Sequence, residues 1–430
     1  MQGRHGRVGA LVATLACLTA PAIADAEDPV LAAAGDIACA PGVPATATTC
    51  QYGATASLIA AANPAVVAAL GDTQYENATP ADYAGAFDPT WGAFKGRIRP
   101  AVGNHEYQTP DAAGYFSYFG PIAGDPATGA YSYDVGAWHA IVLNSNCSIV
   151  SCADGSAQAT WLAQDLAAHR SSPCTLAYWH HPRFSSQTVF LGDDPSTAPL
   201  FKALHDAGVD IVLSGHAHDY ERFAQLTPEG VPSRDRAHGV REFVVGTGGD
   251  EHYSFAGPTR RIGSQASDDT TFGALFLTLH PSSYEWRFDH VLSGDASGSF
   301  TDASSAAVPC HNAPRKVRVR SSVLRVVGGR LPIKVASDPL AARRSTGTLV
   351  VTTSRPVRRG GHKRILRIAQ GSFSVEPGAT ATARPLLTAA ARSVLASLRG
   401  VRLKITAIVR HPFGHTAVSR RTLPLLVGRR

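Results

Sequence analysis

The chain has 430 residues, which is enough for one large domain and a smaller one, each with a buried core. Its charge is uneven: residues 312–430 hold 25 of the 40 Lys and Arg but only two of the 33 acids, so this tail carries +23 and residues 1–311 carry −16. Beyond the N-terminus, no stretch approaches the ~20 apolar residues that a membrane helix needs, which argues against a transmembrane helix in the mature chain.

The N-terminus has the pattern of a secretory signal peptide. Arg4 and Arg7 precede an apolar run at 8–18, and small residues at 22–26 follow with the spacing of a cleavage site. We therefore expect residues 1–26 to be removed and the mature protein to be secreted or associated with the cell surface.

Six cysteines remain after this segment: Cys39, Cys50, Cys147, Cys152, Cys174 and Cys310. An even number in an exported chain predicts disulfides. Short separations favour Cys39 with Cys50 and Cys147 with Cys152, although the sequence alone leaves the pairing open. The absence of a Cys-x-x-Cys pair argues against a zinc ribbon or a redox centre.

From residue 28 to residue 290, short apolar runs alternate with segments of helical pattern. Strands are expected at 30–37, 65–70, 98–102, 140–143, 175–179, 210–213 and 242–245, and helices at 54–62, 157–169 and 197–207. Strands that alternate with helices predict an α/β fold. Two later runs, 274–279 and 284–290, lack intervening helices, so a second, partly antiparallel sheet is expected.

A change of pattern near residue 300 predicts a domain boundary. Residues 301–314 are rich in Ser, Ala and Pro, and we expect them to link a first domain at 27–300 to a second at 315–430. In the second, apolar and polar residues alternate at 316–320, 331–335, 348–352, 366–368 and 401–408, with one helix expected at 386–398. This pattern predicts a small, mostly-β module of the sandwich type.

Side chains of the kinds that bind metals follow strand after strand in the first domain. The strand ends supply, in chain order, Asp36, Asp72, Asn104 with His105, His180 with His181, and His216 with His218. A single Asp or His in such a place is usually a turn residue or a structural side chain. Five successive cases predict a metal site, because the carboxyl ends of parallel strands meet at one edge of a sheet.

These residues stand in five ordered blocks: Gly35-Asp36, Gly71-Asp72-Thr73-Gln74-Tyr75, Gly103-Asn104-His105-Glu106, Ala177-Tyr178-Trp179-His180 and Gly215-His216-Ala217-His218. The set resembles the signature of the calcineurin-like metallophosphoesterases, over about residues 30–292. The form of the second block, and Tyr220-Glu221-Arg222 after the last, resemble the purple acid phosphatases. The resemblance implies a β-sandwich flanked by helices (αββα) that hydrolyses phosphate esters with two metal ions.

Carried over by position, the resemblance implies one metal ion bound by Asp36, Asp72, Tyr75 and His218, and another bound by Asp72, Asn104, His180 and His216. Asp72 would bridge the two ions. Carboxylate, imidazole and amide ligands suit Fe, Mn or Zn, and a phenolate suits ferric iron, so the expected pair is Fe with Zn, Mn or a second Fe.

Further roles are expected beside the metals. His105 would face the leaving group as a proton donor or a clamp on the phosphate, and Asn104, His105 and His181 are the expected substrate contacts. Glu106 would orient a ligand without binding the metal.

Two positions and one segment depart from the family. Ala38 stands where the family usually has the glycine of Asp-x-Gly, and Ala177 opens the fourth block in place of the usual Val. In the wider superfamily the position of Ala38 is commonly the metal-binding histidine of Asp-x-His; because alanine has no ligand atom, Tyr75 is expected to complete the metal's shell. Residues 184–192 contain none of the substrate-contacting histidines that relatives often have there. His181, Arg183 and the loop around His252 are therefore the local candidates for substrate contacts.

The expected activity is hydrolysis of phosphate monoesters by in-line attack of a metal-bound hydroxide. Two alternatives stay open: a phosphodiesterase or nucleotidase with the same metals, and a non-catalytic cell-surface protein that binds through its basic tail. The tail's charge predicts attachment to anionic cell-wall polymer, membrane surface or nucleic acid, and we favour wall or surface retention. The tail lacks the interleaved aromatic residues of a single-strand nucleic-acid surface.

Overall fold

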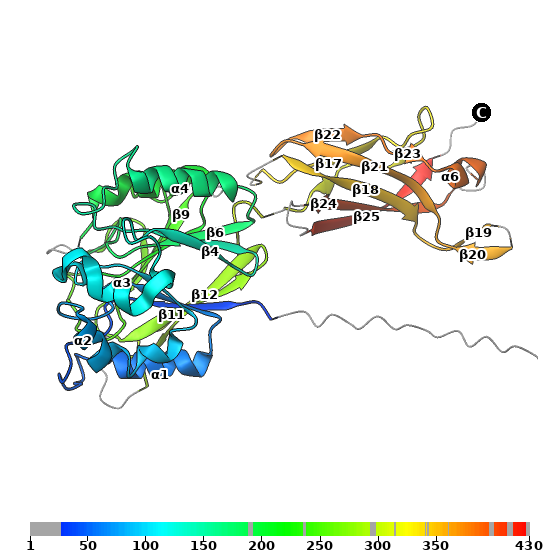
Figure 1. Cartoon of the computed structure of the whole chain (residues 1–430). Coiled ribbons are helices and arrows are strands. Elements are labelled where there is room, and N and C mark those ends of the chain that lie inside the picture. Colours follow the sequence, from blue (N-terminus) through cyan, green and yellow to red (C-terminus); the bar gives the residue numbers. More distant parts are fainter. Residues whose placement is uncertain are drawn as a thin grey trace, which may run out of the picture.

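The computed structural model describes residues 27–187, 192–234, 238–292, 298–313, 315–339, 341, 344–359, 361–394, 400–410 and 416–426. The segment predicted as a signal peptide, residues 1–26, lies outside the described residues. Within the described ranges, no helix has the length and apolar character to cross a membrane. The sheets fall into two groups, one within residues 30–309 and the other within residues 318–426 (Figure 1).

The first sheet of the N-terminal group combines parallel and antiparallel strands. Its parallel strands are β1 (Val30–Ala34), β2 (Val66–Leu70) and β3 (Ile98–Ala101), and its antiparallel strands are β11 (Gly273–His280), β12 (Ser283–His290), β13 (Asp302–Ala303) and β14 (Val308–Pro309). β1 and β2 are almost entirely apolar and buried, as expected of strands that are covered on both faces.

The second sheet has the order β10-β8-β9-β7-β6-β5-β4. Its strands are β4 (Tyr131–Val135), β5 (Trp138–Val142), β6 (Cys174–Tyr178), β7 (Ile211–Ser214), β8 (Tyr220–Leu226), β9 (Val240–Val245) and β10 (Ser264–Asp268). β5, β6, β7 and β9 run parallel, so they end at the same edge. Of these strands, β4, β8 and β10 have no counterpart among the strands expected from the sequence.

Helices cover the outer faces of the two sheets. They are α1 (Tyr52–Ala62), α2 (Pro80–Asp82), α3 (Ala113–Phe119), α4 (Ala157–Ala168) and α5 (Ala198–Ala207), with short 3₁₀ or π turns η1 (Tyr83–Phe87), η2 (Trp91–Phe94), η3 (Glu106–Gln108), η4 (Pro110–Ala112), η5 (Gly120–Ala123) and η6 (Pro195–Thr197). Figure 1 shows α1 and α4 on opposite outer sides. The predicted αββα sandwich is confirmed.

Two hydrophobic cores hold these layers together. Between the sheets, Val67 and Leu275 of the first sheet belong to the same buried cluster as Leu213 of the second. Outside the second sheet, Leu162 of α4 and Leu204 of α5 pack into a separate cluster with its outward-facing side chains. Burial of this apolar area, at roughly 25 cal/mol per Å² removed from water, is the main force that fixes the strand edges relative to one another.

The C-terminal group is mostly β, as predicted. It contains a three-stranded sheet of β15 (Arg318–Val319), β17 (Ile333–Ala336) and β22 (Thr380–Ala383), a six-stranded sheet of β16 (Leu324–Arg325), β25 (Thr416–Leu426), β24 (Arg402–Arg410), β18 (Ser345–Thr353), β21 (Arg367–Val375) and β23 (Leu386–Leu387), and a hairpin of β19 (Val357–Arg359) and β20 (His362–Arg364). Its alternating residues form their own core, which includes Leu349, Ile368 and Ile405.

The helix expected at 386–398 begins later than predicted. Leu386 and Leu387 pair with β21 as strand β23. Helix α6 (Ala389–Val394) begins only after Thr388, whose Oγ1 accepts a hydrogen bond from the backbone N–H of Ala391 (3.0 Å). Thr388 therefore caps the helix, because its side chain takes up a backbone N–H that has no partner within the helix. Residues 395–399 lie outside the described ranges.

The segment predicted as a linker, residues 301–314, is packed against the N-terminal group. β13 and β14 pair with β12, and a disulfide joins Cys310 to Cys174 of β6. The backbone N–H of His311 donates to Asp210 Oδ1 at 2.7 Å. Cys39–Cys50 and Cys147–Cys152, the two pairs that the sequence favoured, are also disulfides. The domain boundaries themselves stay a prediction.

Candidate metal centre

The five predicted blocks meet where the two sheets come together. Asp36 follows β1, Asp72 follows β2, and His180 follows β6, each two residues after the strand ends. The backbone N–H of Gly35 donates to the carbonyl of Val245 at the end of β9 (2.9 Å), which joins the edges of the two sheets. Ligand-type side chains from both sheets therefore point into one region.

Three of these side chains start from a strained backbone. Asp36, Asp72 and His216 have φ angles of 60°, 42° and 66°, in the left-handed region that residues other than glycine rarely adopt. Each such residue costs on the order of 1–3 kcal/mol and persists only when its surroundings hold it. The chain turns sharply at these points, which brings the three side chains into the site.

Two glycines allow the blocks to approach one another closely. A Cβ on Gly71 would lie 2.6 Å from the His180 ring, and a Cβ on Gly103 would lie 2.1 Å from Asp72 Oδ1. Any side chain at either position would displace a predicted ligand. The glycines of the second and third blocks are therefore required by the packing of the site.

The loops after β1 and β2 run side by side, and this places Tyr75. The backbone N–H groups of Ile37 and Ala38 donate to the carbonyls of Asp72 and Thr73, at 2.9 and 3.2 Å. The N–H of Tyr75 in turn donates to the carbonyl of Ala38 at 2.8 Å. Ala38 thus supplies no ligand atom of its own, but its backbone fixes the residue that carries the phenol.

One cluster of ligand-type atoms gathers around this phenol. Tyr75 Oη donates to Asp36 Oδ1 at 3.0 Å, lies 3.0 Å from His218 Nε2 and lies 3.4 Å from Asp72 Oδ2. His218 Nε2 is also 3.3 Å from Asp36 Oδ1. All four residues are buried.

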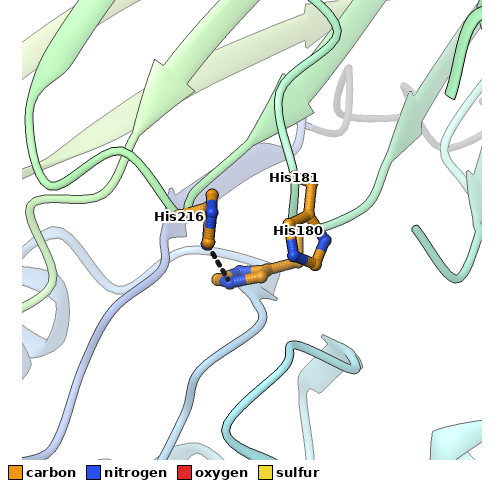
Figure 2. Close-up of side chains that lie close together, drawn as sticks. All are labelled: His180, His181 and His216. Atoms are coloured by element: carbon orange, nitrogen blue, oxygen red, sulfur yellow. Dashed lines mark hydrogen bonds between the residues drawn. The ribbon is translucent and has the colours of Figure 1, made fainter. Parts of the chain in front are cut away.

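A second cluster gathers around His180. Its Nε2 lies 3.1 Å from Asp72 Oδ2, 3.1 Å from Asn104 Oδ1 and 3.2 Å from His216 Nδ1. Figure 2 shows the rings of His180 and His216 turned toward each other, with His181 beside them. Asp72 Oδ2 belongs to both clusters, so the structure brings together all seven predicted ligands in two sets that share one oxygen.

Two of the imidazoles are oriented by backbone carbonyls. His180 Nδ1 lies 2.9 Å from the carbonyl oxygen of Leu70, and His218 Nδ1 lies 2.7 Å from that of Glu251. A carbonyl accepts only from an N–H, so in each neutral ring Nε2 carries the lone pair and faces the cluster. Histidines that bind metals are held in this way. Neither carbonyl was foreseen, because main-chain acceptors leave no trace in the residue types.

The electrostatics of the clusters suit a bound cation. Burial alone would raise the pKa of Asp72. The charge of His180 and the hydrogen bond from His180 outweigh this effect, so the pKa of Asp72 lies well below its usual range. Burial lowers the pKa of His180, yet Asp72 raises it to about 9. Burial and the charge of Asp36 raise the pKa of the Tyr75 phenol. Oxygen and nitrogen donors buried together fit metal ions, which neutralise carboxylates that water cannot reach.

Glu106 holds the second and third blocks together. Its carboxylate accepts hydrogen bonds from the backbone N–H groups of Asp72 (3.1 Å), Thr73 (2.7 Å) and Gly103 (2.6 Å), and from Thr73 Oγ1 (2.8 Å). The side chain is fully buried, and burial raises its pKa. Glu106 contacts the loop of Asp72 rather than the clusters themselves, and the orienting role expected of it stays a prediction.

The expected substrate residues take different positions. His105 lies at the site: its backbone N–H donates to Asp72 Oδ1 (2.9 Å) and its ring Nδ1 lies 2.7 Å from the Glu76 carbonyl, which leaves Nε2 available. The side chain of His181 is partly exposed, and its Nδ1 lies 2.8 Å from Ser145 Oγ. Burial and the neighbouring His180 lower the pKa of His181 to about 3, so this ring is neutral.

The remaining candidates make other contacts. His252 Nδ1 lies 2.9 Å from the carbonyl of His218, so this ring supports the backbone of a ligand. The Arg183 guanidinium lies 4.3 Å from the Phe184 ring, a cation–π contact outside the clusters. Sequence reasoning missed Asp250, whose N–H donates to the Asp36 carbonyl (3.0 Å) and whose pKa burial raises to about 7.

Another His/Asp group, formed by His139, Asp165 and His169, does not fit a single ion. The two rings stack with centroids 3.7 Å apart and planes at 15°. A metal lies close to the plane of each imidazole that binds it, and two parallel, stacked planes have no common position for one ion. His139 is instead held between Asp134 (3.0 Å) and Asp165 (2.7 Å), which raise its pKa despite burial.

Comparison with known proteins gives related sequences for this part of the chain. Residues 30–220 match the family model described as "Calcineurin-like phosphoesterase". Purple acid phosphatase 15 of Arabidopsis thaliana is 29% identical over 194 residues, covering 37% of this chain and 36% of that protein. Purple acid phosphatase 21 of the same plant is 31% identical over 166 residues, covering 34% and 37%. The chain thus spans little more than a third of the length of these relatives.

A solved structure shows the same fold. The purple acid phosphatase PPD1 from yellow lupin (Lupinus luteus) seeds superposes with a TM-score of 0.50 at 20% identity, covering 64% of this chain and 53% of that one. At this identity, the similarity concerns the fold.

We expect Glu106→Gln to weaken both the fold and the site. The amide would turn an N–H₂ toward backbone N–H donors and leave at least one unpaired, at a cost of about 1–3 kcal/mol in the free energy of unfolding. Affinity for divalent metal should fall by roughly 10- to 100-fold, because the loop of Asp72 loses its support. Urea unfolding and Zn²⁺ titration of metal-free protein measure the two effects.

Glu242→Gln is the matched control for this change. Glu242 is also buried and accepts from the backbone N–H groups of Arg183 (2.8 Å) and Phe184 (3.4 Å), away from the Asp72 loop. It should lose stability but keep its metal affinity. Equal metal affinities in the two variants would contradict the positioning role of Glu106.

Proposed function

We propose that this chain, whose residues 30–220 belong to the calcineurin-like phosphoesterase family, is a secreted phosphatase that hydrolyses phosphate monoesters with two metal ions. The observation that carries the proposal is the position of Asp72 Oδ2, 3.4 Å from Tyr75 Oη and 3.1 Å from His180 Nε2. One carboxylate shared by two ligand clusters is what a two-metal centre requires. The names of the curated relatives, purple acid phosphatases, support the reaction class.

In this proposal, Asp36, Tyr75 and His218 would hold one ion, Asn104, His180 and His216 would hold the other, and Asp72 would serve both. When bound, the two ions lower the pKa of a water molecule and neutralise charge on the phosphoryl oxygens. The phenol of Tyr75 favours ferric iron at the first position, and Fe, Zn or Mn suits the nitrogen-rich second position.

The chain's own residues bind the ester and move the proton. Asn104 and His181 contact the phosphate. His105 is anchored at two points, by its backbone N–H to Asp72 and by Nδ1 to the Glu76 carbonyl. Its Nε2 is the group we assign to protonate the departing alcohol; because Nδ1–H is directed at the Glu76 carbonyl, the imidazolium form of His105 supplies this proton from Nε2 and is left as the neutral ring.

Export and surface retention complete the proposal. The pattern of residues 1–26 and the three disulfides support a secreted protein. We propose that residues 315–430 act as a separate module that retains the enzyme on anionic polymer of the cell surface, since nearly all of its charge is positive.

The first test of the metal centre is Asp72→Asn. The amide keeps the size of the side chain but removes the negative charge that two cations share, so p-nitrophenyl phosphate hydrolysis should fall to the background rate and bound metal from two ions to at most one. Metal analysis and steady-state kinetics measure this. Asp165→Asn, in a carboxylate that pairs with His139 instead, should keep both properties. An Asp72→Asn variant with two metals and a normal kcat would refute the site.

Tyr75→Phe tests the metal at the first position. The phenylalanine ring keeps the packing and removes only the oxygen, so a ferric protein should lose its visible charge-transfer absorption and bind iron more weakly. Absorption spectra and iron titration of both proteins measure this. Identical spectra and affinities would remove Tyr75 from the ligand set.

His105→Ala tests the proton donor. We expect kcat to fall by roughly 10² to 10⁴ with metal content unchanged, and the loss to shrink for leaving groups that depart without a proton. A series of aryl and alkyl phosphates measures this dependence. An effect confined to KM would make His105 a binding residue. Faster cleavage of bis(p-nitrophenyl) phosphate than of the monoester would replace the monoesterase by a diesterase.

A further inference from the structure

One set of cations in the C-terminal group lies at one end of its six-stranded sheet. A second set, which includes Arg318 and Arg320, lines a cavity beside the three-stranded sheet together with the acid Asp338. Residues 315–430 contain two acids, Asp338 and Glu376. Glu376 follows the last residue of β21 and forms an ion pair with Arg344, which precedes β18. Since β18 and β21 are antiparallel and Ser345 pairs with Val375, this ion pair lies at the end of the sheet opposite Thr353.

At the Thr353 end, cations stand in register on the exposed face of the sheet. Thr352 of β18 is paired with Lys404 of β24 on one side and with Arg367 of β21 on the other. Lys404 and Arg367 are exposed, whereas Leu403 and Ile368, next to them in sequence, are buried in the core. Arg402, also exposed, follows on the same face two residues along β24, about 7 Å away at the rise of a strand.

The β19–β20 hairpin continues this face beyond the sheet. It connects the end of β18 to the start of β21, and Figure 1 shows it projecting past them. Arg358 and Lys363 are exposed and directly paired across its two strands, and Val357 is paired with Arg364. Like charges opposite each other destabilise a strand pair. The Arg358–Lys363 pair therefore does not stabilise the hairpin, which suggests a role in binding.

We propose that these cations form one binding surface, the basic band, defined as Arg358, Lys363, Arg364, Arg367, Arg402 and Lys404, and that its ligand is a cell-surface polymer with phosphate groups along a hydroxyl-rich chain. The cations bind phosphates of such a polymer at successive positions. Polar side chains lie beside these cations on the same sheet and can hydrogen-bond the hydroxyl groups of the polymer. They are Thr352, Thr422 opposite Lys404, and Gln370 on β21. The proposal rests on the surface retention proposed above and is independent of the metal centre.

Other polyanions fit this surface less well. Single-stranded nucleic acid binds through aromatic side chains that stack on the bases, and the aromatic residues of 315–430 are Phe373, which is buried, and Phe413, which lies outside the described residues. A lipid surface favours several apolar side chains beside the cations. On the sheet, threonine and glutamine occupy positions between the cations. Two exposed apolar side chains also border the band, Ile365 between Arg364 and Arg367 and Leu386 opposite Gln370, so the vesicle measurement below decides against or for a lipid surface.

The experiment compares two triple variants of the full-length protein that lose the same net charge. The test variant is Arg358→Gln with Lys363→Gln and Lys404→Gln, in the basic band. The control is Arg318→Gln with Arg320→Gln and Lys334→Gln, exposed cations on and beside the three-stranded sheet. Binding to purified poly(glycerol phosphate) is measured by calorimetry from 50 to 300 mM NaCl, beside phosphatidylglycerol vesicles and oligo(dT).

The test variant should bind the polymer at least tenfold more weakly than wild type, and its slope of log Kd against log salt should fall by about 2, at roughly 0.7 for each lost contact with a flexible strand. The control should stay within about threefold of wild type. Equal losses in the two variants, or tighter binding of wild type to vesicles or oligo(dT), would overturn the proposal.

Hydrolysis of p-nitrophenyl phosphate separates this inference from the proposed catalysis. It should be unchanged in both triple variants, because the band lies on strands that supply none of the ligand-type residues. If the wild-type protein binds the polymer through the band but does not hydrolyse p-nitrophenyl phosphate, the binding proposal stands and only the catalytic proposal is rejected.

Discussion

The shared carboxylate of Asp72 is the constraint on which the N-terminal group depends. Its Oδ2 belongs to both ligand clusters, while its Oδ1 accepts from the backbone N–H of His105. Buried carboxylates are unstable unless charge or hydrogen bonds compensate them. Glu106, a second buried carboxylate, fixes the same loop by accepting hydrogen bonds from the backbone N–H groups of Asp72 and Thr73. The site is therefore a set of acidic groups that is balanced by imidazoles and, in the function we propose, by two cations.

The cost of this arrangement is distributed over the fold. Left-handed conformations at Asp36, Asp72 and His216 oppose folding, and they occur where strands from the two sheets end. The interior between the sheets supplies the compensating burial of apolar area. Rigid strands on both sides also explain why Gly71 and Gly103 tolerate no side chain, since neither sheet edge can move away without breaking that core.

Much of this could be predicted because the signals were local. Short apolar runs predicted β1 and β2, and alternation of apolar and polar residues predicted β24. Residue type at the strand ends, together with the family resemblance, predicted the candidate ligand set. The strands β4, β8 and β10 were missed because they contain polar residues such as Ser132, Glu221 and Gln265, whose partners come from distant segments. The Leu70 and Glu251 carbonyls could not be predicted for another reason: every residue has a carbonyl, so only the fold selects those two.

The two groups of sheets carry opposite net charge, and this separation has a physical reason. Residues 1–311 carry −16, so a polyanion near them is repelled, and acids such as Asp36 and Asp72 are needed there by the site itself. A surface that binds polyanions must therefore use other residues. It must also lie at least ~8 Å from those acids, because salt screens charges over this distance under physiological conditions. Within its own sheet, the basic band is also separated from the acid Glu376, because the Arg344–Glu376 pair lies at the opposite end of β18 and β21. Nine residues of β18 at about 3.3 Å each put roughly 25–30 Å between the acid and the band, several screening lengths.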